Sequence, residues 1–344
     1  MTDPSFSRRD FLCELGVDLA SLSAGQFFST GRVLRVTDGL GLTSPFTGWS
    51  LYRDVVTYSN LGEHRTATDV DQTTAAWLER HLLDLGFQTE RQVFSVPQSF
   101  VHRVTLLAGA RGLLPVEAFP FWPATYTPQP ISRPMAKFDP DALVTVADKI
   151  ALVTFPYSIT GLMTPEMLDQ VDAAAAAGAV ALVAITNGPT GELTAFNPRG
   201  GRTILPIPVL LVGPKDRGSL EAAVRTGANV KFTMQGVNQP AASAVNIVGR
   251  WINSANAPWV VISTPYSGWF RCGGERGPGI AYWRALSRWV ASRWSSGTSP
   301  PSMPFNYLFL ATSGHELGQY GMTEFLQHQT PSPSSVPLWV HLGA

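Results

Sequence analysis

Short apolar segments alternate with helical ones along this chain, and this alternation is the feature that most constrains its fold. Between residues 149 and 234 the predicted order is strand, helix, strand, loop, strand, helix, strand. The apolar runs at 149–155 and 180–185 flank an alanine-rich helix at 168–177, which Gly178 ends. Such an alternation of strands and helices is typical of an α/β module.

The segments on either side of this module continue the pattern. Residues 69–85 have apolar side chains on one helical face and are followed by Gly86, which predicts a helix and its end. Residues 87–96 are predicted to form a strand that Pro97 ends. Further strands are predicted at 230–234, 244–250, 259–263, 305–311 and 338–342, and helices at 218–225, 279–294 and 321–328. The whole pattern predicts an α/β fold.

The composition limits the partners of the chain. With 344 residues, 44% of them hydrophobic, the chain can form two domains with sizeable cores. Its formal net charge is zero and only 15% of its residues are charged, so neither nucleic acid nor an anionic membrane is favoured as a partner. Beyond the N-terminus, no stretch approaches the ~18 consecutive apolar residues of a membrane span. These features leave the oligomeric state open.

The N-terminus contains a sequence that predicts export. Residues 7–12, Ser-Arg-Arg-Asp-Phe-Leu, resemble the twin-arginine export motif of bacteria, and a moderately apolar segment follows at 15–28. We therefore expect residues 1–30 to be a signal segment and the protein to be periplasmic or extracellular. The alternative is a frayed amphipathic segment on a cytoplasmic protein. The two cysteines, Cys13 and Cys272, cannot form a disulfide framework and do not decide the compartment.

Ionisable residues follow the apolar strand predicted at 305–311. His315 and Glu316 come just after its carboxyl end, which is where α/β folds place their ligands. His315 could act as a general base near neutral pH, and Glu316 could orient it or hold a substrate amine. The alternative is that both residues satisfy backbone groups at the strand end. His64, which precedes the first predicted helix, is expected at the surface.

Other polar residues precede a second predicted helix. Glu275 and Arg276 could cap that helix, or could act as a catalytic carboxylate and as a guanidinium that binds an anion bidentately. Ser267 could be a nucleophile paired with His315, and the alternative is a turn-forming serine. Cys272 could also be a nucleophile, and the alternative is a small core residue.

The order of these elements, together with several short motifs, resembles zinc aminopeptidases of the transferrin-receptor and glutamate-carboxypeptidase type. Two of the motifs are the segment 62–87, which begins with Gly and ends with Leu-Gly-Phe, and the apolar segment 245–249. Residues 148–153 and 207–209 resemble parts of the protease-associated domain that is inserted in these proteins. The resemblance covers roughly residues 50–344.

This resemblance implies a domain organisation. The fold would be a three-layer sandwich with a central mixed sheet, built from the discontinuous segments 45–100 and 240–344. The segment 101–239 would be an inserted α/β domain of the protease-associated type.

The resemblance also implies where a metal site would lie. The family motifs that hold two zinc ions correspond to Pro265-Tyr266-Ser267, Glu275-Arg276 and His315-Glu316. By this correspondence Glu275 and Glu316 are the implied metal ligands, and zinc is the possible cofactor. The ligand set is incomplete, because proline has no donor side chain and Gly343 corresponds to a further ligand, an aspartate. Zinc catalysis needs about three protein ligands and an open position for water.

Three hypotheses for the function follow. The first is an exported aminopeptidase-type hydrolase that acts on peptides or small amides with a mononuclear or metal-free site. Its catalytic residues would be His315, Glu316 and Glu275, and its substrate-binding residues would be Tyr266, Ser267 and Arg276. The second is a catalytically inactive homologue that acts as a binding or assembly module, because fold alone does not determine function. The third is an incomplete chain whose missing C-terminal segment would complete the sheet and the site.

Overall fold

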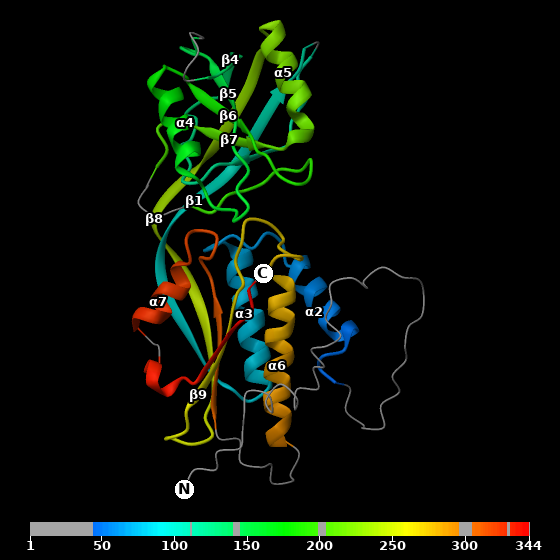
Figure 1. Cartoon of the computed structure of the whole chain (residues 1–344), viewed down its shortest axis with the longest axis vertical. Coiled ribbons are helices and arrows are strands. Elements are labelled where there is room, and N and C mark those ends of the chain that lie inside the picture. The colour runs from blue at the N-terminus through cyan, green and yellow to red at the C-terminus, as the bar shows by residue number, and fades with distance from the viewer. Residues whose placement is uncertain are drawn as a thin grey trace. The chain divides into compact units, whose positions relative to one another are not determined.

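Two long antiparallel strands organise the described part of the protein (Figure 1). In this computed structural model, β1 (Gln88–Ala108) pairs with β8 (Asn229–Trp251) along almost its whole length. The prediction that Pro97 ends the first strand is therefore wrong, as is the prediction that β8 consists of two separate strands. The pairing register shifts between Val96 and Gln98, so an irregularity at Pro97 accommodates the missing N–H of proline.

The structure describes residues 44–110, 112–139, 145–198, 204–295, 305–328 and 331–343. These residues belong to one compact unit that begins at Ser44. The predicted export signal at 1–30 lies outside the described residues. None of the helices in the described part is long and apolar enough to span a membrane.

Three parallel strands lie beside one end of β8. β10 (Asn306–Thr312) pairs antiparallel with β8 and parallel with β9 (Trp259–Pro265). β11 (Leu338–His341) pairs parallel with β9 on its other side. The carboxyl ends of β9, β10 and β11 therefore meet at one edge of the sheet, where α/β folds place their ligands.

Helices cover both faces of this part of the sheet. On one face, Phe325 of α7 (Tyr320–His328) packs with Leu308 and Leu310 of β10. On the other face, Phe309 contacts Trp283 of α6 (Gly277–Ser295) edge to face, with ring centroids 5.6 Å apart. Successive side chains of a strand point to opposite faces, so a strand covered on both sides is apolar throughout. The predicted mixed sheet with flanking helices is confirmed.

Two further helices complete this part of the fold. α3 (Asp69–Asp84) packs against β8, and α2 (Gly48–Asn60) packs against α6. The hydroxyl of Thr68 caps the start of α3 by accepting a hydrogen bond from the N–H of Asp71 at 3.3 Å. Gly86 follows its end with a φ of 89°, a left-handed conformation that glycine adopts readily.

A second group of strands and helices, which we call the second lobe (residues 114–226), adjoins the other end of β8. Four of its strands are parallel to one another: β4 (Ile131–Lys137), β5 (Ile150–Thr154), β6 (Ala181–Ile185) and β7 (Val209–Val212). The short strand β3 (Ala118–Pro120) pairs antiparallel with β7. The short strand β2 (Leu114–Pro115) pairs antiparallel with β1. β4 also pairs antiparallel with β8. The helical segments are α4 (Pro165–Ala176) and α5 (Arg217–Thr226), with 3-10 turns at Pro214–Asp216 and, outside the lobe, Pro333–Ser335.

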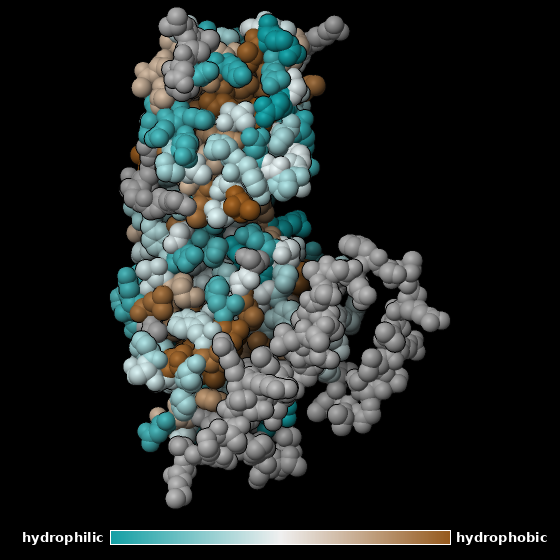
Figure 2. Space-filling model, in the orientation of Figure 1, coloured by the Kyte–Doolittle hydropathy of each residue, from teal (hydrophilic) through white to brown (hydrophobic). Residues whose placement is uncertain are grey.

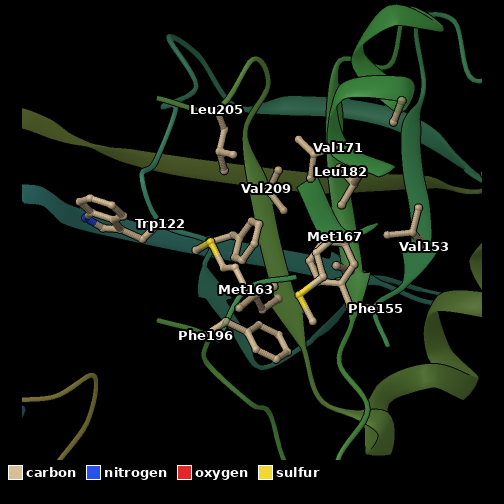
Figure 3. Packing of buried hydrophobic residues seen from close by; sticks show 14 of the residues in the cluster. Trp122, Val153, Phe155, Met163, Met167, Val171, Leu182, Phe196, Leu205 and Val209 are labelled. Atoms are coloured by element: carbon tan, nitrogen blue, oxygen red, sulfur yellow. The ribbon is translucent and has the colours of Figure 1, made fainter. Parts of the chain in front are cut away.

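α4 and α5 bury opposite faces of this second sheet. Figure 3 shows the cluster on the α4 side, where Met167 packs with Leu182 and Phe196. This cluster also includes Trp269 and Leu317, which lie in the loops that follow β9 and β10. The second lobe and those loops therefore share one core. The predicted domain boundaries near residues 100 and 240 fall inside β1 and β8 and remain predictions.

Candidate functional site

The loops after β9 and β10 bring together four of the polar residues that were predicted from the sequence. Ser267 follows β9, His315 and Glu316 follow β10, and Arg276 immediately precedes α6. These four residues are joined by hydrogen bonds at the common carboxyl edge of the sheet. The edge predicted from the strand pattern is therefore a polar, hydrogen-bonded region.

Tyr266, which was predicted to bind substrate, is part of the core. Its side chain is fully buried, and its hydroxyl donates a hydrogen bond of 2.6 Å to the carbonyl of Val245. Burial raises the pKa of its phenol well above the ordinary value. The side chain cannot reach a ligand in this conformation, so the structure gives this residue a packing role.

The carboxylate of Glu316 is held by protein donors on both of its oxygens. Oε1 accepts hydrogen bonds of 2.7 Å from the N–H and from the hydroxyl of Thr66, and Oε2 accepts one of 2.7 Å from the hydroxyl of Ser267. Only 1% of the residue is exposed. Coordination of a metal would therefore require Glu316 to give up bonds that already satisfy it.

A second buried carboxylate, which the sequence did not single out, lies in the same network. Asp71 accepts hydrogen bonds from the hydroxyl of Ser313, at 2.9 and 3.0 Å to its two oxygens, and from the N–H of Ala67 at 2.9 Å. Burial, followed by the nearby charge of Glu316, raises its pKa well above the ordinary value. In the sequence Asp71 stands three residues after Thr68, a spacing that indicates only a helix cap.

Arg276 places a buried positive charge between two of the predicted catalytic residues. Its Nη2 donates to Nδ1 of His315 at 2.7 Å and lies 2.7 Å from Oε1 of Glu275, while its Nε donates to the carbonyl of Ser267 at 3.1 Å. The guanidinium side chain is only 2% exposed, whereas that of Glu275 is 52% exposed. The arginine therefore links the loops after β9 and β10 to the start of α6.

This contact determines what His315 can do. Because the guanidinium is a donor only, Nδ1 of His315 must accept, and its proton lies on Nε2. Burial, and then the charges of Arg276 and His341, lower the pKa of His315 to about 4. The ring is therefore neutral at pH 7 and has no free lone pair, so it can donate from Nε2 but can act as a base only if Arg276 moves.

His341, for which the sequence indicated no role, lies at the end of β11 on the same edge. Its Nδ1 is 2.8 Å from the hydroxyl of Ser263, which also accepts a hydrogen bond of 2.8 Å from Nε1 of Trp339. Since the hydroxyl accepts from the indole, it can donate its own proton to Nδ1. Burial and the charge of Arg276 lower the pKa of His341.

The structure does not favour either candidate nucleophile. Ser267 is fully buried, and its hydroxyl donates to Glu316 while accepting from the N–H of His315 at 3.2 Å. The thiol of Cys272 donates to the carbonyl of Phe270 at 3.2 Å, and burial raises its pKa to about 12. A thiol of that pKa carries almost no thiolate at neutral pH, so the alternative of a small core residue holds for Cys272.

The expectation that His64 lies at the surface is wrong. The residue is fully buried, and its ring stacks on Tyr58 with centroids 3.8 Å apart. Its Nε2 lies 3.0 Å from the carbonyl of Tyr58 and its Nδ1 lies 2.9 Å from the hydroxyl of Thr74. The ring therefore fixes the start of the chain segment that leads to Thr66 and Glu316.

These residues do not fit the two zinc ions that the resemblance implied. Pro265 offers no donor, both oxygens of Glu316 are engaged, and Glu275 pairs with Arg276. Within the described residues, no group of three or more His, Cys, Asp or Glu side chains is arranged to hold a metal ion. The carboxylates and the imidazole at this edge are already hydrogen-bonded to hydroxyls, backbone N–H groups and a guanidinium, so they do not present the three protein ligands that zinc catalysis needs.

The fold is similar to that of zinc aminopeptidases. A zinc aminopeptidase from Bacillus subtilis, BSAP, is similar with a TM-score of 0.66 and 18% identity, over 87% of this chain and 69% of that one. A peptidase M28 precursor from Shewanella amazonensis is similar with a TM-score of 0.66 and 16% identity, over 84% and 69% of the two chains. An aminopeptidase from Aneurinibacillus sp. strain AM-1 is similar with a TM-score of 0.55 and 14% identity, over 85% and 68%.

At these sequence identities the similarity establishes the fold and nothing finer. No protein family matches the sequence, and no curated protein matches it either. The zinc-aminopeptidase fold that the sequence resembled is therefore confirmed. The subfamily and the relation of the second lobe to protease-associated domains remain predictions.

Proposed function

We propose that this protein binds peptides or small amides on a zinc-aminopeptidase fold and does not hydrolyse them with two zinc ions. The observation that supports this proposal most directly is the guanidinium of Arg276, which contacts both Glu275 and His315. This guanidinium is a fixed positive charge between two of the residues that correspond to the zinc motifs, so it disfavours the binding of a metal ion beside it. This is the second of the three hypotheses drawn from the sequence, that of a catalytically inactive binding module.

Two groups at this edge are suited to hold a ligand. Glu275 is half-exposed, so its carboxylate can accept hydrogen bonds from an ammonium group. His315 carries its proton on Nε2 and can donate it to a carbonyl oxygen. Together they suit the amino group and the first carbonyl of a peptide with a free N-terminus, the end on which aminopeptidases act.

The test measures metal content, binding and hydrolysis on the purified chain. After equilibration with zinc, elemental analysis is expected to give far less than one ion per chain. A short peptide with a free N-terminus should bind at least tenfold more tightly than its acetylated form, and Glu275→Gln should remove this preference. The exposed Glu192→Gln in the second lobe serves as the matched control. Stoichiometric zinc together with chelator-sensitive hydrolysis would overturn the proposal.

Metal-free hydrolysis is the second candidate, and the observation that favours it is that His315 is neutral and only half-buried at this edge. If Arg276 moves when a substrate binds, Nδ1 of His315 becomes a proton acceptor. This candidate predicts hydrolysis that is insensitive to chelators, is lost in His315→Ala and is retained in Glu192→Gln. Absence of turnover in the unaltered chain would exclude it.

We also propose that residues 1–30 direct export through a twin-arginine pathway. The support is the motif at residues 7–12 and the apolar segment that follows it. A reporter fused to residues 1–30 should be exported by a bacterium that has this pathway, and replacing Arg8 and Arg9 by lysine should retain the reporter inside the cell. Equal export of both fusions would contradict the proposal.

A further inference from the structure

A cleft of about 430 Å³ lies in the second lobe, between α5 and the carboxyl ends of β4, β5 and β6. This volume is within the range that small-molecule sites occupy, roughly 300–1,000 Å³. The lining residues are Lys137, Phe138, Leu152, Val153, Thr154, Ile185, Arg217, Glu221, Val224 and Arg225. None of them belongs to the hydrogen-bonded edge formed by β9, β10 and β11.

The strand pairing explains why a cleft forms here. β4, β5 and β6 are parallel neighbours, so Lys137, Thr154 and Ile185 end them on the same side of the sheet. α5 begins at Arg217 and runs past these ends. In open α/β sheets the space beyond the carboxyl ends of parallel strands is where ligands bind.

The cleft has an excess of positive charge. Arg217, Glu221 and Arg225 are spaced by four residues and therefore share one face of α5. Arg217 lies 3.8 Å from Glu221, which offsets much of its charge, and also donates to the hydroxyl of Thr154 at 3.3 Å. Within the described residues, Lys137 and Arg225 make no ion pair, so two positive charges remain for a ligand.

The remaining lining is apolar. Leu152 and Ile185 are buried strand residues of the core cluster on the α5 side, and the half-buried Val224 of α5 packs against that cluster. Val153 and Phe138 also line the cleft, although they belong to the cluster on the α4 side. Figure 2 shows hydrophobic residues beside hydrophilic ones on the surface around α5. A fully charged ion such as free phosphate would leave this apolar lining without a partner.

We propose that this cleft binds a small organic anion that has one carboxylate and an apolar body. The carboxylate lies between Lys137 and Arg225, and the apolar body packs against the buried strand residues and Val224. Charge-assisted hydrogen bonds hold the carboxylate, and the apolar lining excludes water from the body of the ligand. This site is independent of the proposed peptide-binding edge.

The experiment is calorimetric titration of the full chain with 4-phenylbutyrate, and with its neutral amide as the matched probe. The carboxylate should bind with a Kd below about 1 mM, and the amide at least tenfold more weakly. Lys137→Gln and Arg225→Gln should each weaken binding about tenfold, whereas Glu221→Gln should tighten it because it removes the opposing charge. Lys231→Gln, an exposed change on β8 outside the cleft, should have no effect.

Thr154→Phe separates occupation of the cleft from loss of folding. Thr154 is exposed at the mouth, so a larger side chain there should abolish binding while the thermal unfolding midpoint stays close to that of the unaltered chain. Equal affinities for 4-phenylbutyrate and its amide would overturn the proposal. Equal losses of affinity for 4-phenylbutyrate in Lys137→Gln and Lys231→Gln would also overturn it. Absence of binding at millimolar concentrations would also overturn it.

Discussion

Hydroxyl groups hold the buried carboxylates of this site. Thr66 and Ser267 donate to Glu316, and Ser313 donates to Asp71. A buried carboxylate is tolerated when donors satisfy it, and hydroxyls do so without introducing a positive charge. These hydroxyl contacts therefore make Glu316 important for stability.

Glu316→Gln is expected to destabilise the protein by about 2 kcal/mol. The NH2 group of the glutamine is a donor, and it would face a group of Thr66 or Ser267 that now donates its hydrogen bond to the carboxylate. Glu275→Gln, the control, should cost less than about 1 kcal/mol, since that side chain is half-exposed and its ion pair is partly solvated. Urea unfolding of both variants measures the difference. Equal losses would show that the hydroxyl contacts to Glu316 contribute little.

Burial of His64 predicts a pH dependence of stability. A histidine in an unfolded chain has a pKa near 6.5, and burial lowers the pKa of His64 to about 4. As the pH falls from 6.5 to 4, the unfolded chain binds this proton first, so the free energy of unfolding decreases by about 3 kcal/mol from this residue. Above pH 6.5 the residue contributes no pH dependence.

Urea unfolding between pH 4 and pH 7 tests this prediction. In His64→Gln the free energy of unfolding should fall less steeply with pH, and the difference in slope should correspond to the uptake of about one proton. His81, which is half-buried and whose pKa is lowered to about 3 by desolvation and then by Arg284 and Arg288, should account for part of the slope that remains. As a control, Asn229→Ala, which changes an exposed and non-ionisable residue of β8, should leave the slope unchanged. A slope in His64→Gln equal to that of the unaltered chain would contradict the prediction.

At the scale of secondary-structure elements, a single side chain of β8 holds the turn between β10 and α7. Nδ2 of Asn246 donates to the carbonyl of Gly321 at 2.7 Å and to Oε1 of Gln92 at 2.9 Å. Its Oδ1 accepts from the N–H of Ser313 at 3.2 Å. Gly314 begins the turn with a φ of 81°, so the loop that carries His315 needs both glycine and this asparagine.

Asn246→Ala should therefore destabilise the protein by about 3 kcal/mol, because it removes a hydrogen-bond partner from each of three buried polar groups. Asn229→Ala, at the exposed first residue of the same strand, should cost less than about 1 kcal/mol. Thermal and urea unfolding of the two variants compare them directly. If the two changes cost the same, the turn is held by its backbone alone.

At the scale of the whole described unit, β1 and β8 belong to both parts of the sheet. β8 pairs with β10 through one end and with β4 through the other, and β1 follows it along both. Trp269 adds to this continuity, since its Nε1 donates to Oδ1 of Asn197 at 2.8 Å and its ring lies in the core of the second lobe. Unfolding of either part would expose residues of the other.

Hydrogen exchange is accordingly expected to show one cooperative unit. Amides of β6 and β10 should exchange with opening free energies that agree within about 1 kcal/mol, although the two strands lie in different lobes. Mass spectrometry of peptides that cover Ala181–Ile185 and Asn306–Thr312 measures both. Exchange of β6 at a much lower opening free energy would show that the second lobe opens independently.

The sequence alone determined the positions of most strands and helices and the class of fold. Apolar runs such as residues 305–311 and stops such as Gly86 are local signals, because burial and backbone conformation act on neighbouring residues. The sequence also determined that polar groups follow β10 and that Pro265 cannot bind a metal. It failed at Pro97, where pairing with β8 carries the strand through a residue that locally ends one.

The tertiary structure alone decided how the site works. Thr66 and Glu316 are 250 residues apart in the chain, and nothing in the letters around either residue indicates that they hydrogen-bond. Likewise, only the packing of the α6 start against the β10 loop brings Arg276 to His315 and fixes its tautomer. Hydrogen bonds depend on distances of a few tenths of an ångström, and these are set by long-range packing that a local sequence pattern does not contain.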